Sequence, residues 1–383
     1  MYGNTRDGSV KGTVQSGYES VRSAFEENLT SGAELGGHFA VYRHGHAIVD
    51  LWGGAMARNA SQPIERTSLY TLFSATKGIA ATCIAMLVER GELRYDDLVS
   101  TYWPDFSQNG KEKFTIGELL SHQVGLATTR IATTVEDYYD HDVVASALAQ
   151  QKPYFAPGVW AYHAQTFGVL ADELIRRVDG RTLRQFFCDE LQSVAEGDLW
   201  IGLPESEDAR HVGIEKSPAP SDVTFDPPMP EMYERTMTNP VIDLEWPNQR
   251  QFREAGIPSA GGSGNARGLA KIYAALVSNA KPLLSDSVLK DATCQRIAGV
   301  DQGSGGIGRY AAGFRMNVGD MGANPAAFGH PGLGGTTGFA DAKRELGVGY
   351  TSCRACLTKW QHPDSRLTRL LSAFYAADKA LTS

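Results

Sequence analysis

The residues best suited to chemistry are a serine and a lysine three apart, in the segment Phe73-Ser74-Ala75-Thr76-Lys77-Gly78. At helical spacing both side chains project from one face, within mutual reach. A serine hydroxyl is a weak nucleophile at neutral pH, and a lysine can activate it when its pKa is lowered by burial or nearby positive charge. The turns after Lys77 are almost wholly apolar, which favours a buried, functional lysine over a solvated one.

Two later segments could complete a site around this pair. Tyr162 follows the turn Ala156-Pro157-Gly158 and precedes a helical pattern, so its phenol could reach back towards Ser74 and Lys77. The segment from Gly329 to Gly338, GHPGLGGTTG, carries glycines that allow a backbone to approach a ligand closely. It lacks the Lys-Ser ending and following helix of a phosphate-binding loop, so we exclude that class of site.

The surrounding elements must position these residues. Apolar periodicity predicts a buried central helix over 76–89, and Thr115 with Glu118 fits a capping box. The other predicted elements are helices over 17–31, 163–178, 265–278 and 365–378, a hairpin over 38–52 turning at 43–46, and strands over 310–317, 337–341 and 347–353. Strands at both chain ends around a helical middle predict an α+β fold, with one antiparallel sheet flanked by helices plus a mostly helical lobe.

We expect a single catalytic domain over 1–383. Its α/β lobe would comprise 1–73 and 263–383, and its helical lobe 74–202. A proline-rich, irregular stretch over 203–262 would form a loop-rich lid or insertion.

Composition excludes several classes of protein. The 383 residues carry a formal charge of -8 and no long basic run, which argues against a nucleic-acid partner. No stretch has the roughly 18 apolar residues of a membrane span, and no signal peptide is visible, so we expect a cytoplasmic protein. The five cysteines are scattered, and we interpret Cys353 and Cys356 as ordinary thiols rather than metal ligands.

In this order and at these separations, the three segments resemble the serine β-lactamase and penicillin-binding-protein family, nearest to its class C-like, family VIII-type carboxylesterases and related transacylases. The resemblance runs from the hairpin through LFSATKGIAATCIAMLVERGEL, WAYHAQTFGVLADELI and FGHPGLGGTTGFAD to the last helix. It implies the β-lactamase/transpeptidase-like fold. It also implies that Ser74 is acylated, that Lys77 accepts its proton, and that Tyr162 acts as general base and acid.

The resemblance further implies roles for the glycine-rich segment. The third motif falls on His330-Pro331-Gly332, and the oxyanion donors fall on the backbone N–H groups of Ser74 and Leu333. Two departures matter. Ala164 stands where the family's second motif has asparagine, and His330 replaces the lysine suited to a carboxylate. Both departures favour a neutral ester or amide as substrate over a β-lactam.

We therefore expect a serine hydrolase acting on a small ester, with no metal or organic cofactor. A transacylase would share the first half-reaction and differ in its acceptor, which the sequence cannot separate. A β-lactamase or D-amino-peptidase carries lower weight, and a non-catalytic binding protein is disfavoured because Ser74, Lys77 and Tyr162 are all present. His163, Trp160 and Trp246 are candidates for substrate contact, whereas His122 is interpreted as structural. No motif indicates the oligomeric state.

Overall fold

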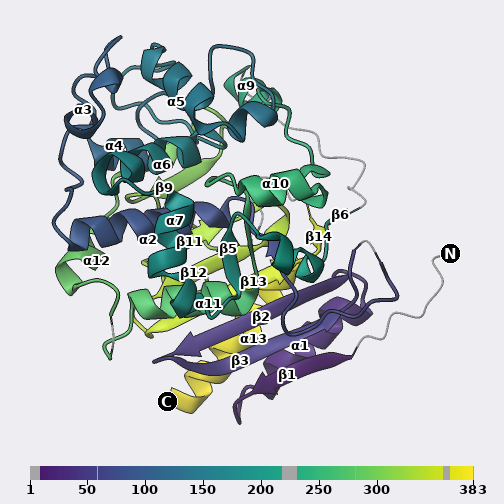
Figure 1. Cartoon of the computed structure of the whole chain (residues 1–383). Coiled ribbons are helices and arrows are strands. Elements are labelled where there is room, and N and C mark those ends of the chain that lie inside the picture. The colour runs from purple at the N-terminus through teal and green to yellow at the C-terminus, as the bar shows by residue number, and fades with distance from the viewer. Residues whose placement is uncertain (1–8, 58, 218–230, 281, 357–362, 383) are drawn as a thin grey trace.

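The computed structural model describes residues 9–57, 59–217, 231–280, 282–356 and 363–382. Its centre is a nine-stranded antiparallel sheet in the order β1-β3-β2-β13-β12-β11-β10-β9-β8 (Figure 1). The strands are β1 (Val10–Val14), β2 (Gly36–Arg43), β3 (His46–Gly54), β8 (Ile297–Val300), β9 (Ile307–Tyr310), β10 (Arg315–Met316), β11 (Phe328–Pro331), β12 (Thr337–Asp341) and β13 (Leu346–Ser352). This confirms the predicted fold class.

A strand from the N-terminal part of the chain pairs with one from the C-terminal part inside this sheet. Strands β2 and β13 pair from Arg43 opposite Leu346 to Gly37 opposite Ser352. The predicted hairpin forms β2 and β3, and its turn places His44 and Gly45 at φ of 51° and 79°. Two successive positive φ values match the twist of the flanking strands, as in the favoured two-residue hairpin turns.

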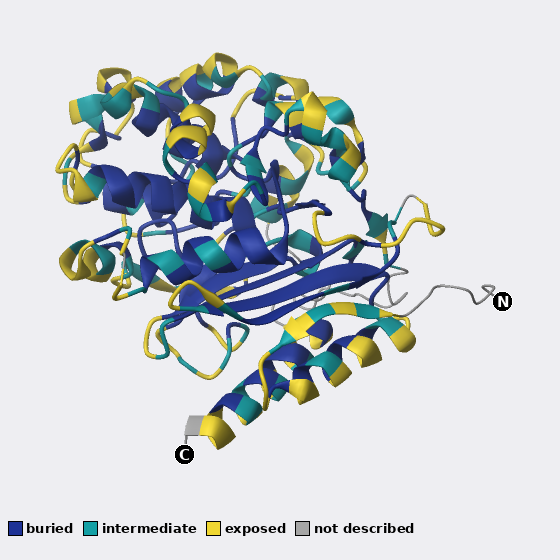
Figure 2. Ribbon diagram, turned by 60° about the horizontal axis from the view of Figure 1, so that its bottom comes forward, coloured by how far each residue is buried: buried dark blue, intermediate teal, exposed yellow. Residues whose placement is uncertain are grey.

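Helices cover both faces of the sheet. On one face, α1 (Glu19–Thr30) and α13 (Ser365–Thr382) share a core with β2, β3 and β13. Figure 2 shows α13 turning its buried side towards the sheet and its exposed side to solvent. On the other face, α11 (Ala266–Leu276) packs on β13 and β2, while α2 (Ala75–Glu89) packs on β11.

Helix α2 lies between the sheet and a helical lobe (Figure 1). Every residue from Ala75 to Leu87 is buried, as the continuous apolar pattern predicts. The lobe contains α3 (Val99–Tyr102), η1 (Pro104–Phe106), α4 (Ile116–Leu120), η2 (Glu136–Tyr138), α5 (His141–Gln150), α6 (Thr166–Asp179), α7 (Leu183–Glu190) and α8 (Gln192–Ala195). The predicted capping box of Thr115 and Glu118 is present at the start of α4.

The segment after 202 is less irregular than predicted. It carries η3 (Glu205–Arg210), β6 (Glu215–Lys216), α9 (Glu231–Thr238), η4 (Trp246–Asn248) and α10 (Arg250–Ala255). Residues 218–230 of the expected lid, with Phe225 among them, lie outside the described part. A short pairing joins β6 to β14 (Arg354–Ala355). In a small three-stranded sheet, β7 (Gly262–Gly264) pairs with β4 (Tyr70–Thr71) on one side and with β5 (Leu199–Ile201) on the other. Helix α12 (Asp286–Ala292) follows α11.

Two local predictions differ from the structure, and some strands were not predicted. The helix expected from His163 begins at Thr166, because the preceding backbone bonds to other elements. The strand expected over 310–317 is interrupted, because residues 311–314 turn between β9 and β10 with Gly313 at φ 84°. Strands β1, β8 and β11 of the central sheet were not predicted. Within the described part, no helix is both long and apolar enough to cross a bilayer.

Candidate active site

Ser74 lies in the turn between β4 and α2. Phe73, directly before it, has φ of 46°, a left-handed conformation that a bulky residue rarely adopts and that tends to persist at functional positions. Ser74 is the N-cap of α2 and is only half-buried, whereas Thr71–Phe73 and the helix that follows are buried. The turn therefore presents one polar side chain from an otherwise enclosed segment.

Lys77 is fully buried beside Ser74. Its Nζ lies 3.2 Å from Ser74 Oγ, 2.7 Å from the carbonyl oxygen of Ala164 and 2.9 Å from that of Ser259. Burial holds the pKa of Lys77 well below its ordinary value. Because the two carbonyls each take an N–H, a neutral Lys77 has its lone pair left for the Ser74 hydroxyl. The geometry thus fits Lys77 as the base that accepts the serine proton.

Tyr162, from a distant part of the sequence, also contacts Ser74. Its hydroxyl forms a hydrogen bond with Ser74, and Lys77 Nζ lies 5.1 Å from the centroid of its ring. Burial is the largest influence on Tyr162 and raises its pKa, although the bond to Ser74 acts in the other direction. Tyr162 is therefore a protonated phenol near neutral pH, suited to giving a proton.

The glycine-rich segment packs directly against the serine turn. A Cβ on Gly332 would overlap the carbonyl oxygen of Leu72, two residues before Ser74. Gly332 has φ of -111°, so the close approach, and not the dihedral angle, requires glycine here. Leu333 packs on the same small apolar cluster as Phe73. Gly332, the neighbour of Leu333, therefore lies against the turn that contains Ser74, and the oxyanion role of the Ser74 and Leu333 N–H groups stays a prediction.

His330 lies beside this site as a neutral imidazole. It is 2% exposed, its ring centroid is 6.0 Å from that of Tyr162, and burial is the largest cause that lowers its pKa well below the ordinary value. Nδ1–H donates to the carbonyl of Pro331 over 2.7 Å, which leaves Nε2 as an acceptor with no partner among the described residues. His330 thus offers no cation to a substrate carboxylate.

The residues predicted to contact substrate, His163, Trp160 and Trp246, each pack against other parts of the protein. His163 is fully buried, with Nδ1–H donating to Ala161 O and Nε2 accepting from Leu126 N. Trp160 is 4% exposed and packs with Tyr162 and Tyr310. Trp246 packs on Phe252 and the large core, not on the cluster beside Ser74. The first two support the backbone around Tyr162, and the third supports η4.

Sequence reasoning missed several residues of the site. The carbonyls of Ala164 and Ser259 are main-chain groups, which no side-chain pattern reveals. Leu244, two residues before Trp246, packs with Phe73 and Leu333 in the cluster formed by Phe73, Ile214 and Ala355. An aliphatic residue in an irregular stretch gives no sequence signal.

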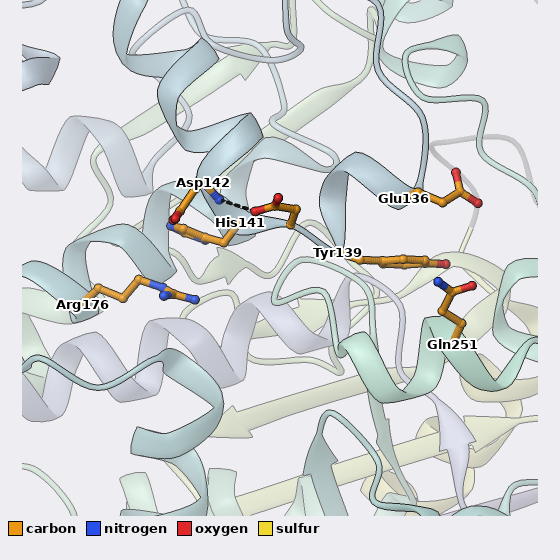
Figure 3. A pocket seen from close by; sticks show the side chains of 7 residues that line it. Glu136, Tyr139, His141, Asp142, Arg176 and Gln251 are labelled. Carbon is orange, nitrogen blue, oxygen red and sulfur yellow. Dashed lines mark hydrogen bonds between the residues drawn. The ribbon is translucent and has the colours of Figure 1, made fainter.

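A separate hollow of about 480 Å³ opens on the helical lobe (Figure 3). It is lined by Glu136, Tyr139, Asp140, His141, Asp142, Arg176 and Gln251, and it includes none of Ser74, Lys77 and Tyr162. No group of three or more His, Cys, Asp or Glu residues within the described ranges is placed to hold a metal. Cys353 is buried and Cys356 half-buried, and neither forms a disulfide.

Known proteins match this chain over nearly its whole length. The Beta-lactamase family matches residues 21–370. The esterase/beta-lactamase LipL of Mycobacterium tuberculosis is 31% identical over 356 residues, covering 89% of this chain and 82% of its own. A family VIII carboxylesterase structure superimposes with a TM-score of 0.89 at 34% identity, covering 96% of this chain and all of its own. A penicillin-binding-protein homologue from Caulobacter crescentus gives 0.87 at 33% identity, covering 96% and 100%.

Proposed function

The chain belongs to the β-lactamase family, and from this premise we propose that it is a serine carboxylesterase working through an acyl-enzyme on Ser74. The observation that carries the proposal is the position of the buried Lys77. Its Nζ contacts the carbonyl oxygens of Ala164 and Ser259, and the lone pair of a neutral amine held there can face Ser74 Oγ. Relatives that are 31% and 34% identical to this chain include an esterase/beta-lactamase and a family VIII carboxylesterase.

Acylation begins with proton transfer from Ser74 to neutral Lys77 as Oγ attacks the ester carbonyl. The oxyanion that forms is stabilised by the N–H groups of Ser74 and Leu333, each worth roughly 3 kcal/mol when aligned. When the C–O bond breaks, Tyr162 gives its proton to the departing alcohol. Lys77 then returns the serine proton to the Tyr162 oxygen, which restores both groups.

Deacylation reverses these roles. A water molecule takes the place of the alcohol, and neutral Lys77 accepts its proton, directly or through the Tyr162 hydroxyl, as the water attacks the acyl carbonyl. The second tetrahedral intermediate collapses, the acid leaves, and Ser74 Oγ regains a proton. An alcohol in place of water would give acyl transfer by the same steps, and the described residues favour neither acceptor.

The surroundings of Ser74 support an uncharged ester with an apolar acyl group. Neutral His330 replaces the family's cation, and Ala164 has no side-chain amide to hold a β-lactam substituent. Beside the serine turn, Phe73, Ile214 and Ala355 form an apolar cluster completed by Leu244 and Leu333. Apolar side chains favour an alkyl group and disfavour a carboxylate.

Turnover of short p-nitrophenyl esters and of the β-lactam nitrocefin tests the proposal, with intact mass recorded for the wild type and Ser74→Ala. We expect ester turnover, an acyl adduct on the wild type, and loss of both in Ser74→Ala. We expect much slower nitrocefin cleavage. Nitrocefin turnover equal to ester turnover would overturn the esterase assignment, and turnover surviving in Ser74→Ala would overturn the nucleophile.

A further inference from the structure

The backbone around Tyr162 belongs to no helix or strand, so its position depends on other groups. Residues 160–164 lie between the turn at Gly158 and the start of α6. Backbone N–H groups that are buried need partners, and those of residues 161–164 find partners outside regular structure. Ala161 N–H donates to the carbonyl of His122, and His163 N–H donates to Nδ1 of His122.

The N–H of Tyr162 itself donates to a carboxylate from a distant part of the chain. Asp301 Oδ1 accepts from Tyr162 N over 3.0 Å and from Gly303 N over 2.8 Å. Asp301 Oδ2 accepts from Ser304 Oγ over 2.6 Å. Asp301 is 1% exposed, so these bonds are its alternative to water.

Asp301 is held rigidly by the loop that carries it. The loop joins β8 to β9, and Asp301 N–H donates to Gly306 O while Gly305 N–H donates to Asp301 O. Gln302 N–H donates to Trp160 O, which ties the loop to the tyrosine segment a second time. Tyr310, at the end of β9, stacks against Tyr162 with ring centroids 6.1 Å apart.

We propose that Asp301 is the positioning residue for Tyr162, fixing the phenol against Ser74 through its backbone and facing it with a buried negative charge. This inference rests on the proposed function for the role of Tyr162. It assigns the β8–β9 loop, which touches neither Ser74 nor Lys77 in the described contacts, to the reaction.

The charge of Asp301 has its own consequence for Tyr162. The groups that face the phenol are Ser74, Lys77, His122, Tyr310, Arg315, His330 and Asp301. Asp301 raises the pKa of Tyr162, and Arg315 on β10 acts in the other direction. Neutralising Asp301 should therefore lower the pKa of Tyr162 and weaken its retention of a proton at high pH.

Two substitutions separate position from charge. Asp301→Asn keeps an acceptor oxygen for Tyr162 N–H but removes the charge, whereas Asp301→Ala removes both. Asp341→Asn and Asp341→Ala are the matched controls, because Asp341 is another fully buried carboxylate, bound by Asn324 Nδ2 and Tyr375 OH at the other side of the sheet. Thermal unfolding of all four variants gives the folded fraction used to normalise rates.

For Asp301→Ala we expect kcat for an ethyl ester to fall roughly 100-fold with KM changed less than about threefold, since a small displacement of a reacting group has effects of this size. For Asp301→Asn we expect a loss of about threefold to tenfold, with the alkaline limb of kcat moved to lower pH. Asp341 variants should keep wild-type kcat per folded molecule. Equal losses in the Asp301 and Asp341 variants, or an unmoved alkaline limb in Asp301→Asn, would overturn the inference.

A fluorophosphonate probe keeps this test separate from the proposed function. Its covalent attachment to Ser74 is followed by intact mass and needs no ester turnover. If wild type hydrolyses no ester but Asp301→Ala slows labelling, the esterase proposal fails and the positioning role stands. If wild type hydrolyses esters and Asp301→Ala slows neither labelling nor ethyl-ester hydrolysis, the positioning role fails alone.

Discussion

Lys77 Nζ lies 2.7 Å from the carbonyl oxygen of Ala164, the third residue of the second motif. The contact uses the main chain of a residue whose side chain is a single methyl group. The lysine is therefore oriented without the amide that the family usually places at this position. Its orientation towards Ser74 survives the sequence change, whereas the means of holding a β-lactam side chain does not.

Replacing Lys77 by arginine should abolish activation of Ser74. A guanidinium stays protonated at every accessible pH, so it cannot take the serine proton. We expect kcat/KM for a p-nitrophenyl ester to fall by roughly 1,000-fold, within the range for loss of a general base. In the wild type, kcat/KM should rise with pH through the lowered pKa of Lys77, because only the neutral amine is active.

Lys111 supplies the control for that experiment. It is also buried, and its Nζ donates to the carbonyls of Gln108 and Gln151 over 2.9 and 2.6 Å. Lys111→Met should lower the unfolding temperature but leave kcat/KM per folded molecule unchanged. If Lys77→Arg keeps more than a tenth of the wild-type kcat/KM, the substitution has raised the activation free energy by less than about 1.4 kcal/mol. That result would show that Lys77 is not the base.

Tyr162→Phe should harm esters of poor leaving groups most. Ethoxide needs a proton as it departs, whereas p-nitrophenoxide is stable without one. With the same acyl group, we expect kcat for the ethyl ester to fall roughly 100-fold or more. The factor by which kcat falls for the p-nitrophenyl ester should be at least tenfold smaller than the factor for the ethyl ester. Tyr138→Phe removes another buried hydroxyl and should change neither rate. An equal loss on both esters would contradict the general-acid role.

Gly332→Ala should move the Leu333 N–H group away from the Ser74 N–H group, the other predicted oxyanion donor. The new methyl group would overlap Leu72 O, which belongs to the backbone and cannot move alone. We expect kcat to fall about 100-fold, the effect of losing one donor. Gly117→Ala is the control, because its methyl group meets only the end of the Arg296 side chain. The rate of acyl-enzyme formation, measured by rapid mixing, should be unchanged in Gly117→Ala.

Leu244, rather than Trp246, should set the acyl-chain preference. Leu244→Ala removes part of the apolar cluster beside Phe73, so we expect kcat/KM for a hexanoyl ester to fall about tenfold relative to an acetyl ester. Trp246→Ala should lower stability and leave that ratio unchanged, because Trp246 packs on Phe252. A change of the ratio in Trp246→Ala alone would restore that residue as the substrate contact.

His141 should make stability depend on pH above neutrality. Nδ1 pairs with Asp172 over 3.0 Å and Nε2 with Glu173 over 2.7 Å (Figure 3 shows the His141 region). Burial opposes the charged form, but the two carboxylates prevail and raise the pKa of His141 to about 9. This stabilisation is complete below the unfolded pKa of about 6.5 and is lost as pH rises through about 9.

The measurement is urea unfolding of wild type and His141→Gln between pH 6 and 10. We expect a stability difference on the order of 3 kcal/mol at pH 6 that shrinks steadily towards pH 10. A difference that does not change with pH would show that His141 contributes by packing rather than by charge.

Sequence patterns predicted the elements whose apolar period is unambiguous, notably the buried α2 and the amphipathic α13. The spacing of Ser74 and Lys77 and the family resemblance for Tyr162 also predicted that these three side chains lie together, as they do in the structure. They could not predict Asp301, which lies 139 residues beyond Tyr162 and acts on a backbone N–H. Trp246 is a sequence-based candidate because aromatic residues stand out in irregular sequence, whereas the packing of Leu244 depends on neighbours brought together only in the fold.

The pairing of β2 with β13 sets the order in which this protein can mature on the ribosome. Arg43 and Leu346 are neighbours in the sheet but more than 300 residues apart in the chain. Until Ser352 has been synthesised, β2 cannot be fully paired along this edge, and β11 with the turn that follows it at Gly332 is missing for most of that time. The edge of β2 that pairs with β13 therefore stays unpaired while the residues between the two strands are synthesised, and the site around Ser74 is complete only after β11 has joined the sheet.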